Sequence, residues 1–373
     1  MRGKIFAKAG LEGVYIVESE ISDIDGINGK LHYRGIPVEI LAEKSNFEET
    51  AFLILNGHLP TKQELIEFKN QIFKAKKINS KIISFLKNFN KNDEMMDILR
   101  TTISYMGCCD NDDNVSIKKS IELAGAFATI IASGYRIKNN LEPIEPLSSL
   151  SHAQNFYYML KGEKPDDITS KIIDTALILH AEQGLNASTF TAMVISSSLS
   201  DLYSAITGAI GTLKGPLHGG ANIKVIKMFE EIKHPDNVEE YLSNLIKNKQ
   251  KIMGFGHRVY KTWDPRAKFF KKLIKENLKD HDNIYIKIAE RIEKFMLEHF
   301  SHKKIYPNID FYSGILYSLI GIPEELFTPI FAMARVIGWA AHVLEYRKNN
   351  RIFRPLSLYK GNLDVVYKNI EER

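Results

Sequence analysis

Three short segments of this 373-residue chain place ionisable side chains among glycines and prolines, where a side chain stays open to a ligand. They read GPLHGGAN (215–222), GFGHRVYK (254–261) and PNIDFY (307–312). Together they supply two imidazoles, His218 and His257, and one carboxylate, Asp310. These are the groups that move protons in general acid–base catalysis. The sequence therefore points first to proton-transfer chemistry.

His218 is predicted to be a neutral hydrogen-bond donor. A helix is expected to begin near Ala221, with its N-terminus directed toward the imidazole. The positive end of the helix dipole disfavours an imidazolium ion, as in enzymes that use a neutral histidine as electrophile. The alternative is a histidine that caps a turn, and this segment by itself does not separate the two.

The segment around His257 is followed by Asp264-Pro265-Arg266 and resembles an anion site. Arginine offers a planar fork to a carboxylate, and Lys261 offers a point charge to a phosphate. The alternative is a basic turn before a helix. Asp310 has two interpretations as well: a helix N-cap, or a general base kept partly dry by its apolar neighbours.

Two arginines and one further histidine stand in unusual places. Arg335 interrupts the apolar run FAMARVIGWAAHV, where an unpaired charge would be costly. Arg354 precedes a proline in the tail RIFRPLSLY. A buried arginine normally pairs with a carboxylate or phosphate of the protein or of a ligand. His180 lies on an apolar helix face, which is typical of a core histidine.

The elements that must position these residues are almost all helices. The first 35 residues, with Gly26, Gly29 and Gly35, predict small strands joined by tight turns. Helical periodicity follows, and no strand is expected after residue 40. The charge-poor stretch 188–211 predicts one fully buried helix and a candidate subunit interface. Asp264-Pro265 and Thr328-Pro329 are each expected to cap and open a helix, the second ending near Arg347.

Composition places the chain among ordinary globular proteins. Apolar residues make up 44%, and 50 Lys and Arg against 45 Asp and Glu leave a net charge of +5. No basic stripe stands apart from acidic neighbours, so nucleic-acid binding is not expected. The only cysteines, Cys108 and Cys109, do not make a disulfide framework and predict a reducing cytoplasm.

No membrane association is expected. The N-terminus lacks the apolar core of a signal peptide. The most apolar stretch, 326–346, contains Pro329, Arg335 and His342, and is expected to be a buried helix rather than a membrane span.

Taken together, these motifs resemble the citrate synthase family over essentially the whole chain. Further matches are LHYRGIP (31–37), NAST (186–189), MGFGHRVYKTWDPR (253–266), YPNIDFYSG (306–314) and RPLSLY (354–359). Length and tail resemble the short dimeric form of archaea and many bacteria. The resemblance implies an all-α two-domain fold with a small N-terminal β region. Its large domain would comprise 1–219 and 321–373, and a small domain, 220–320, would bind CoA and close over the site.

The resemblance also implies roles for individual residues. Asp310 would remove a proton from the acetyl-CoA methyl group, His218 would hydrogen-bond the thioester oxygen, and His257 would polarise the oxaloacetate carbonyl. The expected ligands of oxaloacetate are His180, Gln183, Arg266, Arg335 and Arg354, the last donated to the neighbouring subunit of a homodimer. The expected CoA contacts are Ile252, Met253, Gly254 and Lys261.

The implied reaction condenses acetyl-CoA, oxaloacetate and water to citrate and CoA, the acyltransferase step that opens the tricarboxylic acid cycle. No metal or redox cofactor is needed. One departure concerns 180–183, where many relatives read His-Ala-Asp-His and this chain reads His-Ala-Glu-Gln. The amide of Gln183 can donate a hydrogen bond but cannot carry a proton charge.

Three alternatives remain beside this reading. A 2-methylcitrate synthase using propionyl-CoA, or an enzyme accepting both thioesters, shares the catalytic set, and one methyl group is worth only about 1–3 kcal/mol of discrimination. His218, His257 and Asp310 could instead form a two-histidine, one-carboxylate metal site. The chain could also be a non-catalytic helical binding protein.

Overall fold

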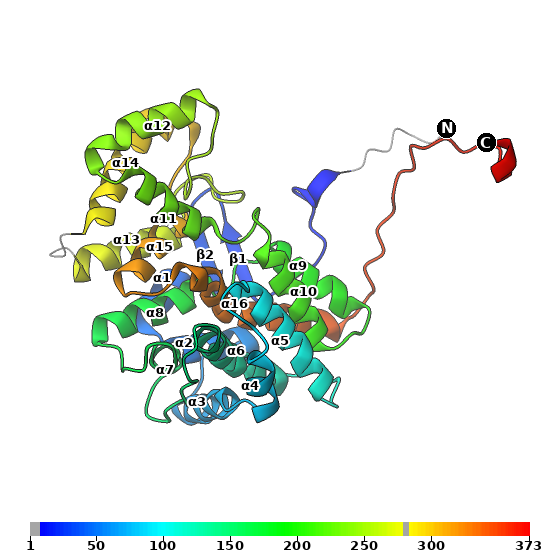
Figure 1. Ribbon diagram of the computed structural model, residues 1–373, viewed down its shortest axis with the longest axis horizontal. Coiled ribbons are helices and arrows are strands. Elements are labelled where there is room, and N and C mark those ends of the chain that lie inside the picture. The colour runs from blue at the N-terminus through cyan, green and yellow to red at the C-terminus, as the bar shows by residue number, and fades with distance from the viewer. Residues whose placement is uncertain (1–7, 279–282) are drawn as a thin grey trace.

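The computed structural model describes residues 8–278 and 283–373, and nearly all of their regular structure is helical (Figure 1). The predicted β region is confirmed as one small antiparallel sheet with strand order β1-β2-β3. Asp25 makes the tight turn between the first two strands, because its Oδ1 accepts the backbone N–H groups of Ile27 and Asn28. The strands are β1 (Ser22–Asp25), β2 (Lys30–Tyr33) and β3 (Ile36–Pro37).

Sixteen α-helices lie within the described ranges, joined by loops and short 3₁₀ turns. The α-helices are α1 (Val38–Lys44), α2 (Phe47–Asn56), α3 (Lys62–Lys76), α4 (Ser80–Leu86), α5 (Met95–Cys109), α6 (Ile117–Lys138), α7 (His152–Lys161), α8 (Asp167–His180), α9 (Ala187–Ser197), α10 (Leu202–Lys214), α11 (Ala221–Ile232), α12 (Val238–Lys247), α13 (Pro265–Asn277), α14 (Ile284–Phe300), α15 (Ile309–Leu319) and α16 (Phe327–Lys348). The 3₁₀ turns are η1 (Ala9–Leu11), η2 (Pro235–Asn237), η3 (Ser301–Lys303), η4 (Glu324–Leu326) and η5 (Ile370–Glu372).

Helix α16 is the central element of the larger helical body. It packs against α2, α5, α6, α8, α9 and α10. The segment 324–348 is long and apolar enough to cross a membrane, but 94% of its most apolar window is buried inside the fold. The expected buried helix is therefore confirmed. Gly338 allows α16 to approach the turn after α8, because a Cβ there would lie 2.5 Å from the Ala181 carbonyl oxygen.

The prediction of one buried helix over 188–211 is wrong. The chain forms α9 and α10, with a break at 198–201 where Leu199 takes a positive φ of 72°. Asp201 then starts α10 by accepting the Ser204 N–H, a side-chain cap that competes with helix continuation. Val194 and Leu199 are 36% and 66% exposed. The pair of helices thus leaves part of its apolar surface uncovered.

The predicted starting point of α16 is also wrong. Its N-cap is Leu326, without a side-chain hydrogen bond, and a 3₁₀ turn precedes it. Pro329 lies in the first turn, where no intrahelical N–H bond is lost. The Asp264-Pro265 start of α13 is confirmed, because Asp264 accepts the Arg266 N–H. Helix α8 stops at His180, and Gly184 follows in a left-handed turn.

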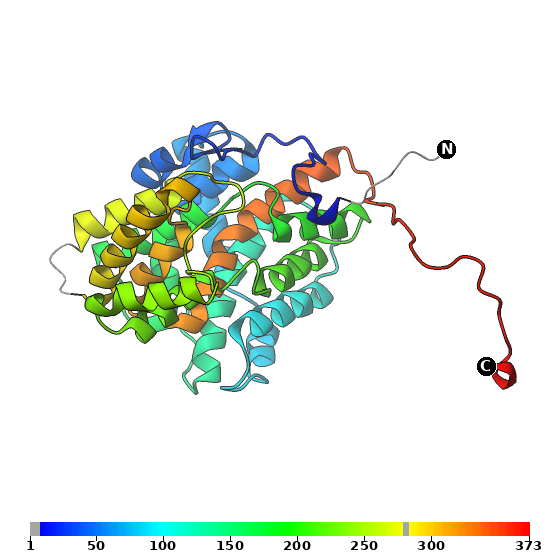
Figure 2. The same cartoon turned by 90° about the horizontal axis from the view of Figure 1, so that it is seen from above.

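Helices α11 to α15 form a second, smaller group at the upper left of Figure 1 and the left of Figure 2. They pack on one another through α11 with α15, α13 with α15 and α12 with α14. Contacts of α1 and α8 with α13, and of α8 with α15, join this group to the larger body. The catalytic segments predicted from the sequence flank this junction.

Backbone pairing brings the His257 loop beside the start of α15. Phe255 forms a β-bridge with Pro307, Gly256 N donates to Tyr306 O at 2.9 Å, and Asn308 N donates to Gly254 O at 2.9 Å. Gly254 has a φ of +78°, and a Cβ there would lie 2.8 Å from the Phe311 Cβ. A side chain at this position would therefore meet both backbone strain and a packed ring.

We predict that Gly254→Ala lowers the melting temperature more than Gly256→Ala. Gly256 has a similar φ of +81°, but a Cβ there meets nothing within 4 Å. Both variants carry left-handed strain of about 1–2 kcal/mol, and only Gly254→Ala adds overpacking of about 1–3 kcal/mol. Thermal unfolding of the two variants side by side measures the difference. Equal melting temperatures would contradict the close packing of Gly254 against α15.

Candidate active site

His257 is held as a neutral imidazole by its own loop. Its Nδ1 accepts the backbone N–H groups of Val259 and Tyr260, each at 3.1 Å. A nitrogen that accepts two hydrogen bonds carries no proton, so the proton is on Nε2. Burial and the nearby Arg266 charge lower the pKa of His257 to about 4. Near neutral pH the ring therefore presents a single Nε2–H donor.

His218 is held by a serine that was not predicted from the sequence. Ser188 Oγ lies 2.8 Å from His218 Nε2 and accepts the Trp339 indole N–H at 3.0 Å. Asn186 Oδ1 already accepts two backbone N–H groups. Ser188 Oγ also lies 2.8 Å from this amide oxygen. Because the amide oxygen already has two donors, we assign the serine proton to His218 Nε2, which leaves Nδ1–H of His218 as a donor.

The pKa of His218 falls to about 4 through burial and the Arg335 charge. This pKa agrees with the predicted neutral imidazole, and burial is its largest cause.

Asp310 lies in the first turn of α15, which Asn308 caps by accepting the Asp310 N–H at 3.0 Å. The N-cap role considered for Asp310 thus belongs to Asn308. Burial raises the pKa of Asp310 to about 6, although Arg266 and Arg335 act in the opposite direction. A carboxylate with such a pKa is ionised at neutral pH and is a stronger base than an exposed one.

Arg266 and Asp264 form a buried two-point ion pair. Arg266 Nε and Nη2 donate to the two carboxylate oxygens of Asp264 at 3.0 and 2.8 Å. Asp264 Oδ2 also accepts the Ile309 N–H at 3.3 Å, which joins α13 to α15. Although burial opposes it, the Arg266 charge lowers the pKa of Asp264. The sequence identified Asp264 only as a helix cap.

Arg335 is almost fully buried, and no carboxylate of the described residues pairs with it directly. Its Nε donates to the His180 carbonyl at 2.6 Å, and its guanidinium lies 4.7 Å from the Phe331 ring centre. Its Nη2 is buried without a partner. Burial lowers the pKa of Arg335 to about 10, well above neutral pH. A buried cation with a free N–H end is what binds a ligand carboxylate.

Glu182 anchors the turn that follows α8, because it joins three distant parts of the chain. Its Oε1 is 3.0 Å from both Ser22 Oγ and His342 Nε2, and Tyr33 Oη donates to its carbonyl at 2.9 Å. This network was not predicted. It fixes the backbone that presents Gln183 and the His180 carbonyl.

His180 and Gln183 line the same buried region. His180 Nδ1 donates to the Ala176 carbonyl at 2.8 Å, its ring packs on Phe331, and its Nε2 has no partner. Burial lowers the pKa of His180 to about 3, so these are the contacts of a core histidine. Gln183 Oε1 is also buried without a partner. Arg335, His180 and Gln183 thus bring unpaired polar atoms to one region, which marks a ligand site.

The remaining predicted residues lie elsewhere. Arg354 is exposed and donates only to the Pro355 carbonyl, outside this group in its own chain. Lys261 is exposed, with its Nζ 3.2 Å from the Arg258 carbonyl. Ile252 and Met253 are half-buried and Gly254 is buried, in the loop that precedes His257.

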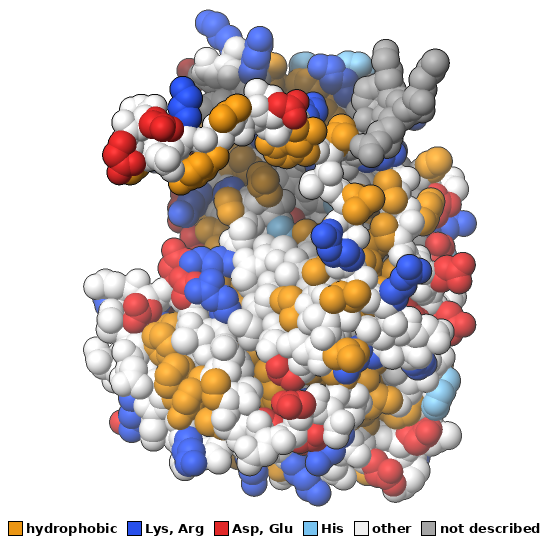
Figure 3. All heavy atoms as spheres, turned by 90° about the vertical axis from the view of Figure 1, so that its right-hand side faces the viewer, with side chains coloured by type: hydrophobic (Ala, Val, Ile, Leu, Met, Phe, Trp, Pro, Cys, Tyr) orange, Lys and Arg blue, Asp and Glu red, His pale blue; other side chains and the backbone are white. Residues whose placement is uncertain are grey.

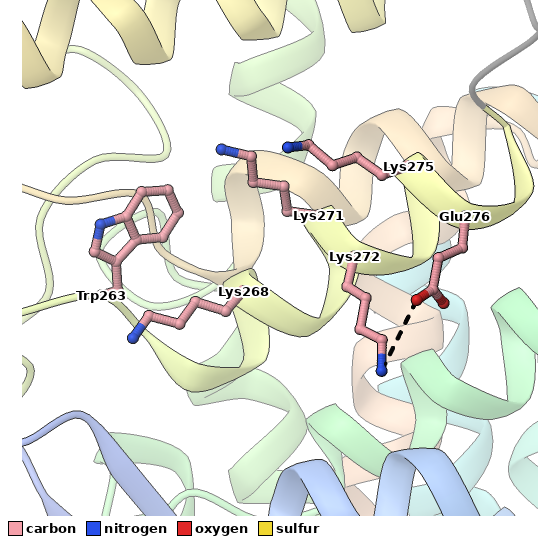
Figure 4. Close-up of a pocket in the computed structure, with 6 residues that line it drawn as sticks. All are labelled: Trp263, Lys268, Lys271, Lys272, Lys275 and Glu276. Atoms are coloured by element: carbon pink, nitrogen blue, oxygen red, sulfur yellow. Dashed lines mark ion pairs between the residues drawn. The ribbon is translucent and has the colours of Figure 1, made fainter.

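A surface cavity of about 580 Å³ lies apart from these residues and is lined by Trp263, Glu276 and four lysines of α13 (Figure 4). Lys271 pairs with Glu293, and Lys272 pairs with Glu43 and Glu276. Carboxylates therefore offset the charges of Lys271 and Lys272. None of the predicted catalytic or binding residues lines this cavity.

The fold is helical, and the site combines groups suited to acid–base chemistry with a buried arginine suited to a carboxylate. Within the described ranges, no group of three His, Cys, Asp or Glu side chains is arranged to hold a metal ion.

Comparisons with known proteins extend this assignment. Residues 10–356 match the family described as "Citrate synthase, C-terminal domain". The citrate synthase of Deinococcus radiodurans is 43% identical over 370 residues, 98% of each chain. The crystal structure of citrate synthase from Thermotoga maritima shares 48% identity over 99% of each chain, with a TM-score of 0.91. The chain belongs to the citrate synthase family.

Two further relatives bear on substrates. Citrate synthase from Thermoplasma acidophilum, solved as a ternary complex with carboxymethyl coenzyme A and oxaloacetate, has a TM-score of 0.92 at 38% identity over 98% of each chain. A 2-methylcitrate synthase of Mycobacterium tuberculosis is 40% identical over 363 residues, 95% of this chain and 91% of the relative.

We predict that Asp264→Asn destabilises the fold by about 3–5 kcal/mol, because it leaves the Arg266 guanidinium buried without a counter-ion. Glu43→Gln is the matched control. It breaks the Lys272–Glu43 pair, whose side chains are 48% and 53% exposed, and should change stability by less than about 1 kcal/mol. Thermal or urea unfolding compares the two. Similar losses of stability in the two variants would contradict the larger contribution expected of the buried Asp264–Arg266 pair.

Proposed function

We propose that this chain condenses acetyl-CoA with oxaloacetate and water to give citrate and free CoA. One observation carries the proposal: His218, His257 and Asp310 are half-buried, and the same two buried arginines act on their pKa values, Arg335 on His218 and Asp310 and Arg266 on His257 and Asp310. Both imidazoles are held neutral, the pKa of the carboxyl is raised, and Arg335 Nη2 has no partner among the described residues. This set supplies a base, two hydrogen-bond donors and a carboxylate receptor. The substrates named in the Thermoplasma acidophilum complex fit those groups.

In the first step, Asp310 takes a proton from the methyl carbon of acetyl-CoA. The electron pair moves into the carbonyl, and the His218 Nδ1–H donates to the developing enol oxygen. Ser188 keeps the proton on that nitrogen by binding Nε2. A neutral donor suits this step, because an imidazolium would neutralise the base beside it.

In the second step, the enol carbon adds to the keto carbon of oxaloacetate. The His257 Nε2–H donates to the keto oxygen and supplies its proton as the new hydroxyl forms. Arg335 binds one carboxylate through its free Nη2, and Arg266 adds positive charge to the same region. Water then attacks the citryl thioester and returns a proton to His257 Nε2, and the proton held by Asp310 goes to the departing CoA thiolate. Citrate and CoA are released, and the new carboxylic acid loses its proton to solvent. The proposal requires no metal or redox cofactor.

The residues that would bind the substrates come from both helical bodies, so we include domain closure and CoA binding in the proposal. Residues 220–320 would act as the small domain that closes on 1–219 and 321–373 and excludes water from the thioester. Lys261 would bind CoA phosphates, and the backbone of 252–254 would contact the adenine. We place the enzyme in the cytoplasm, which the two free thiols Cys108 and Cys109 support.

We propose a homodimer in which Arg354 completes the partner's oxaloacetate site. Residues 351–373 leave the body as an extended tail (Figures 1 and 2). Hydrophobic side chains are spread over the face from which it leaves (Figure 3). The tail itself exposes apolar residues that one copy of the chain does not cover: Leu356, Leu358, Leu363, Val365, Val366 and Tyr367.

The 40% identity to a 2-methylcitrate synthase favours one alternative, the use of propionyl-CoA. The same base and donors would enolise either thioester. The ratio of kcat/KM for acetyl-CoA and propionyl-CoA separates the two activities, and thiol release with oxaloacetate measures both. Absence of thiol release from either thioester would overturn the proposal and favour a non-catalytic binding protein.

Asp310→Asn should reduce kcat by about 10²–10⁴-fold, the usual contribution of a general base. The amide is nearly the same size but cannot accept the methyl proton. Asp236→Asn is the control, since that carboxylate is 85% exposed in another turn. Thiol release with oxaloacetate gives both rates. Retention of most activity by Asp310→Asn would contradict its role as the base.

The pH profile of the reaction should reflect the titration of Asp310. Below its raised pKa of about 6, Asp310 gains a proton and loses its basicity, so kcat/KM for acetyl-CoA should fall tenfold per unit as the pH drops below about 6. His218 and His257 stay neutral to about pH 4 and do not produce this limb. An acid limb near pH 4 would contradict the assignment.

Mixed dimers test the donated arginine. Arg354→Ala and His218→Ala should each be nearly inactive alone. Co-expressed, they should recover about a quarter of wild-type activity, because half of the dimers are mixed and each holds one intact site. If Arg354 served the site of its own chain, no mixed dimer would contain a complete site and no activity would return.

A further inference from the structure

The side chains of Gln183 and Tyr260 meet where the larger helical body contacts the His257 loop. Gln183 Nε2 lies 3.2 Å from Tyr260 Oη, and the two residues are only 9% and 2% exposed. Gln183 belongs to the turn between α8 and α9, whereas Tyr260 precedes α13. The contact therefore links two segments that the domain prediction assigns to different domains.

Tyr260 is itself fixed to the catalytic histidine. Its backbone N–H donates to His257 Nδ1 at 3.1 Å, and the two rings lie 4.7 Å apart at 35°. Burial raises the pKa of Tyr260 to about 12, so its hydroxyl keeps its proton and can both donate and accept. The position of the hydroxyl thus follows the position of His257.

A phenol hydroxyl can bind either end of an amide, because the amide oxygen accepts and the amide nitrogen donates. In the structure Nε2 faces Tyr260 and Oε1 is buried without a partner. Turning the amide by 180° keeps the contact, with Tyr260 donating to Oε1, and exposes Nε2 to the site. A keto oxygen, which only accepts, requires this second arrangement.

We propose that Tyr260 is a positioning residue. Its hydroxyl holds one end of the Gln183 amide so that the other end donates to the keto oxygen of oxaloacetate. The proposal rests on the proposed condensation and adds a residue to it. It explains how the Gln183 amide can serve at a position where many relatives have histidine. A freely rotating amide must be oriented before it can donate to the keto oxygen, and the Tyr260 hydroxyl orients it. The Tyr260 ring also contacts the His257 imidazole, which would polarise the same carbonyl.

Tyr260→Phe removes only the hydroxyl and keeps the ring against His257. We expect KM for oxaloacetate to rise about tenfold, the scale of one buried hydrogen bond left unmade. The kcat should stay within about threefold, and KM for acetyl-CoA and the acid limb of the pH profile should not move. Tyr241→Phe is the control, since it removes a tyrosine hydroxyl that binds Glu231 outside the site.

A double-mutant cycle tests whether Tyr260 acts through Gln183. Gln183→Leu should raise KM for oxaloacetate at least as much as Tyr260→Phe, and the double variant should be no worse than Gln183→Leu alone. Independent, multiplying losses would overturn the proposal, as would an unchanged KM in Tyr260→Phe. Melting temperatures confirm that each variant is folded.

Calorimetric binding of oxaloacetate separates this inference from the proposed function. If the wild-type chain releases no CoA yet binds oxaloacetate, the condensation is wrong. The same cycle, measured by binding affinity, still decides the role of Tyr260. If the wild-type chain condenses both substrates and Tyr260→Phe binds oxaloacetate as tightly as wild type, only the positioning role is lost.

Discussion

Two buried guanidinium groups, Arg266 and Arg335, set the electrostatics on which the rest of the site depends. Burial lowers the pKa of both histidines. The charge of Arg266 lowers that of His257 further, and the charge of Arg335 lowers that of His218 further, so both rings stay neutral. The same two charges moderate the pKa of Asp310, which burial would otherwise raise further. The base is therefore ionised and the donors are uncharged at one and the same pH.

The two arginines are compensated in different ways, and the difference points to a ligand. Asp264 pairs with Arg266 at two points, which makes that charge part of the protein's structure. Glu182 is close enough to affect the pKa of Arg335, but only its Oε1 is hydrogen-bonded, to Ser22 and His342, and no ion pair joins its carboxylate to Arg335 among the described residues. Arg335 therefore keeps a free N–H end in a dry environment. A substrate carboxylate would complete this pairing, and its arrival would relieve the cost of a buried cation.

Sequence motifs predicted the groups that we propose to touch substrate, but they did not predict the groups that hold those side chains in place. His218, His257 and Asp310 stand in glycine- or proline-bearing turns with a local signature. Ser188 and Trp339 are 151 residues apart in the chain, and nothing near either residue indicates the pairing. The same limit applies to the fold: side-chain capping by Asp201 divides the expected helix over 188–211, and a 3₁₀ turn starts α16 before Thr328-Pro329. Such outcomes depend on competition between local caps and tertiary packing, which one segment's pattern does not contain.

The central claim is that Asp310 faces the methyl carbon of the thioester while His218 and His257 donate to the oxygens of the two reactants. A crystal structure with oxaloacetate and an unreactive CoA analogue tests it most directly. The account predicts a carboxylate oxygen of Asp310 in contact with the acyl carbon, and hydrogen bonds from His218 Nδ1 and His257 Nε2 to the thioester and keto oxygens. A complex with Asp310 turned away from the acyl group and both imidazoles out of reach of the ligands would contradict it.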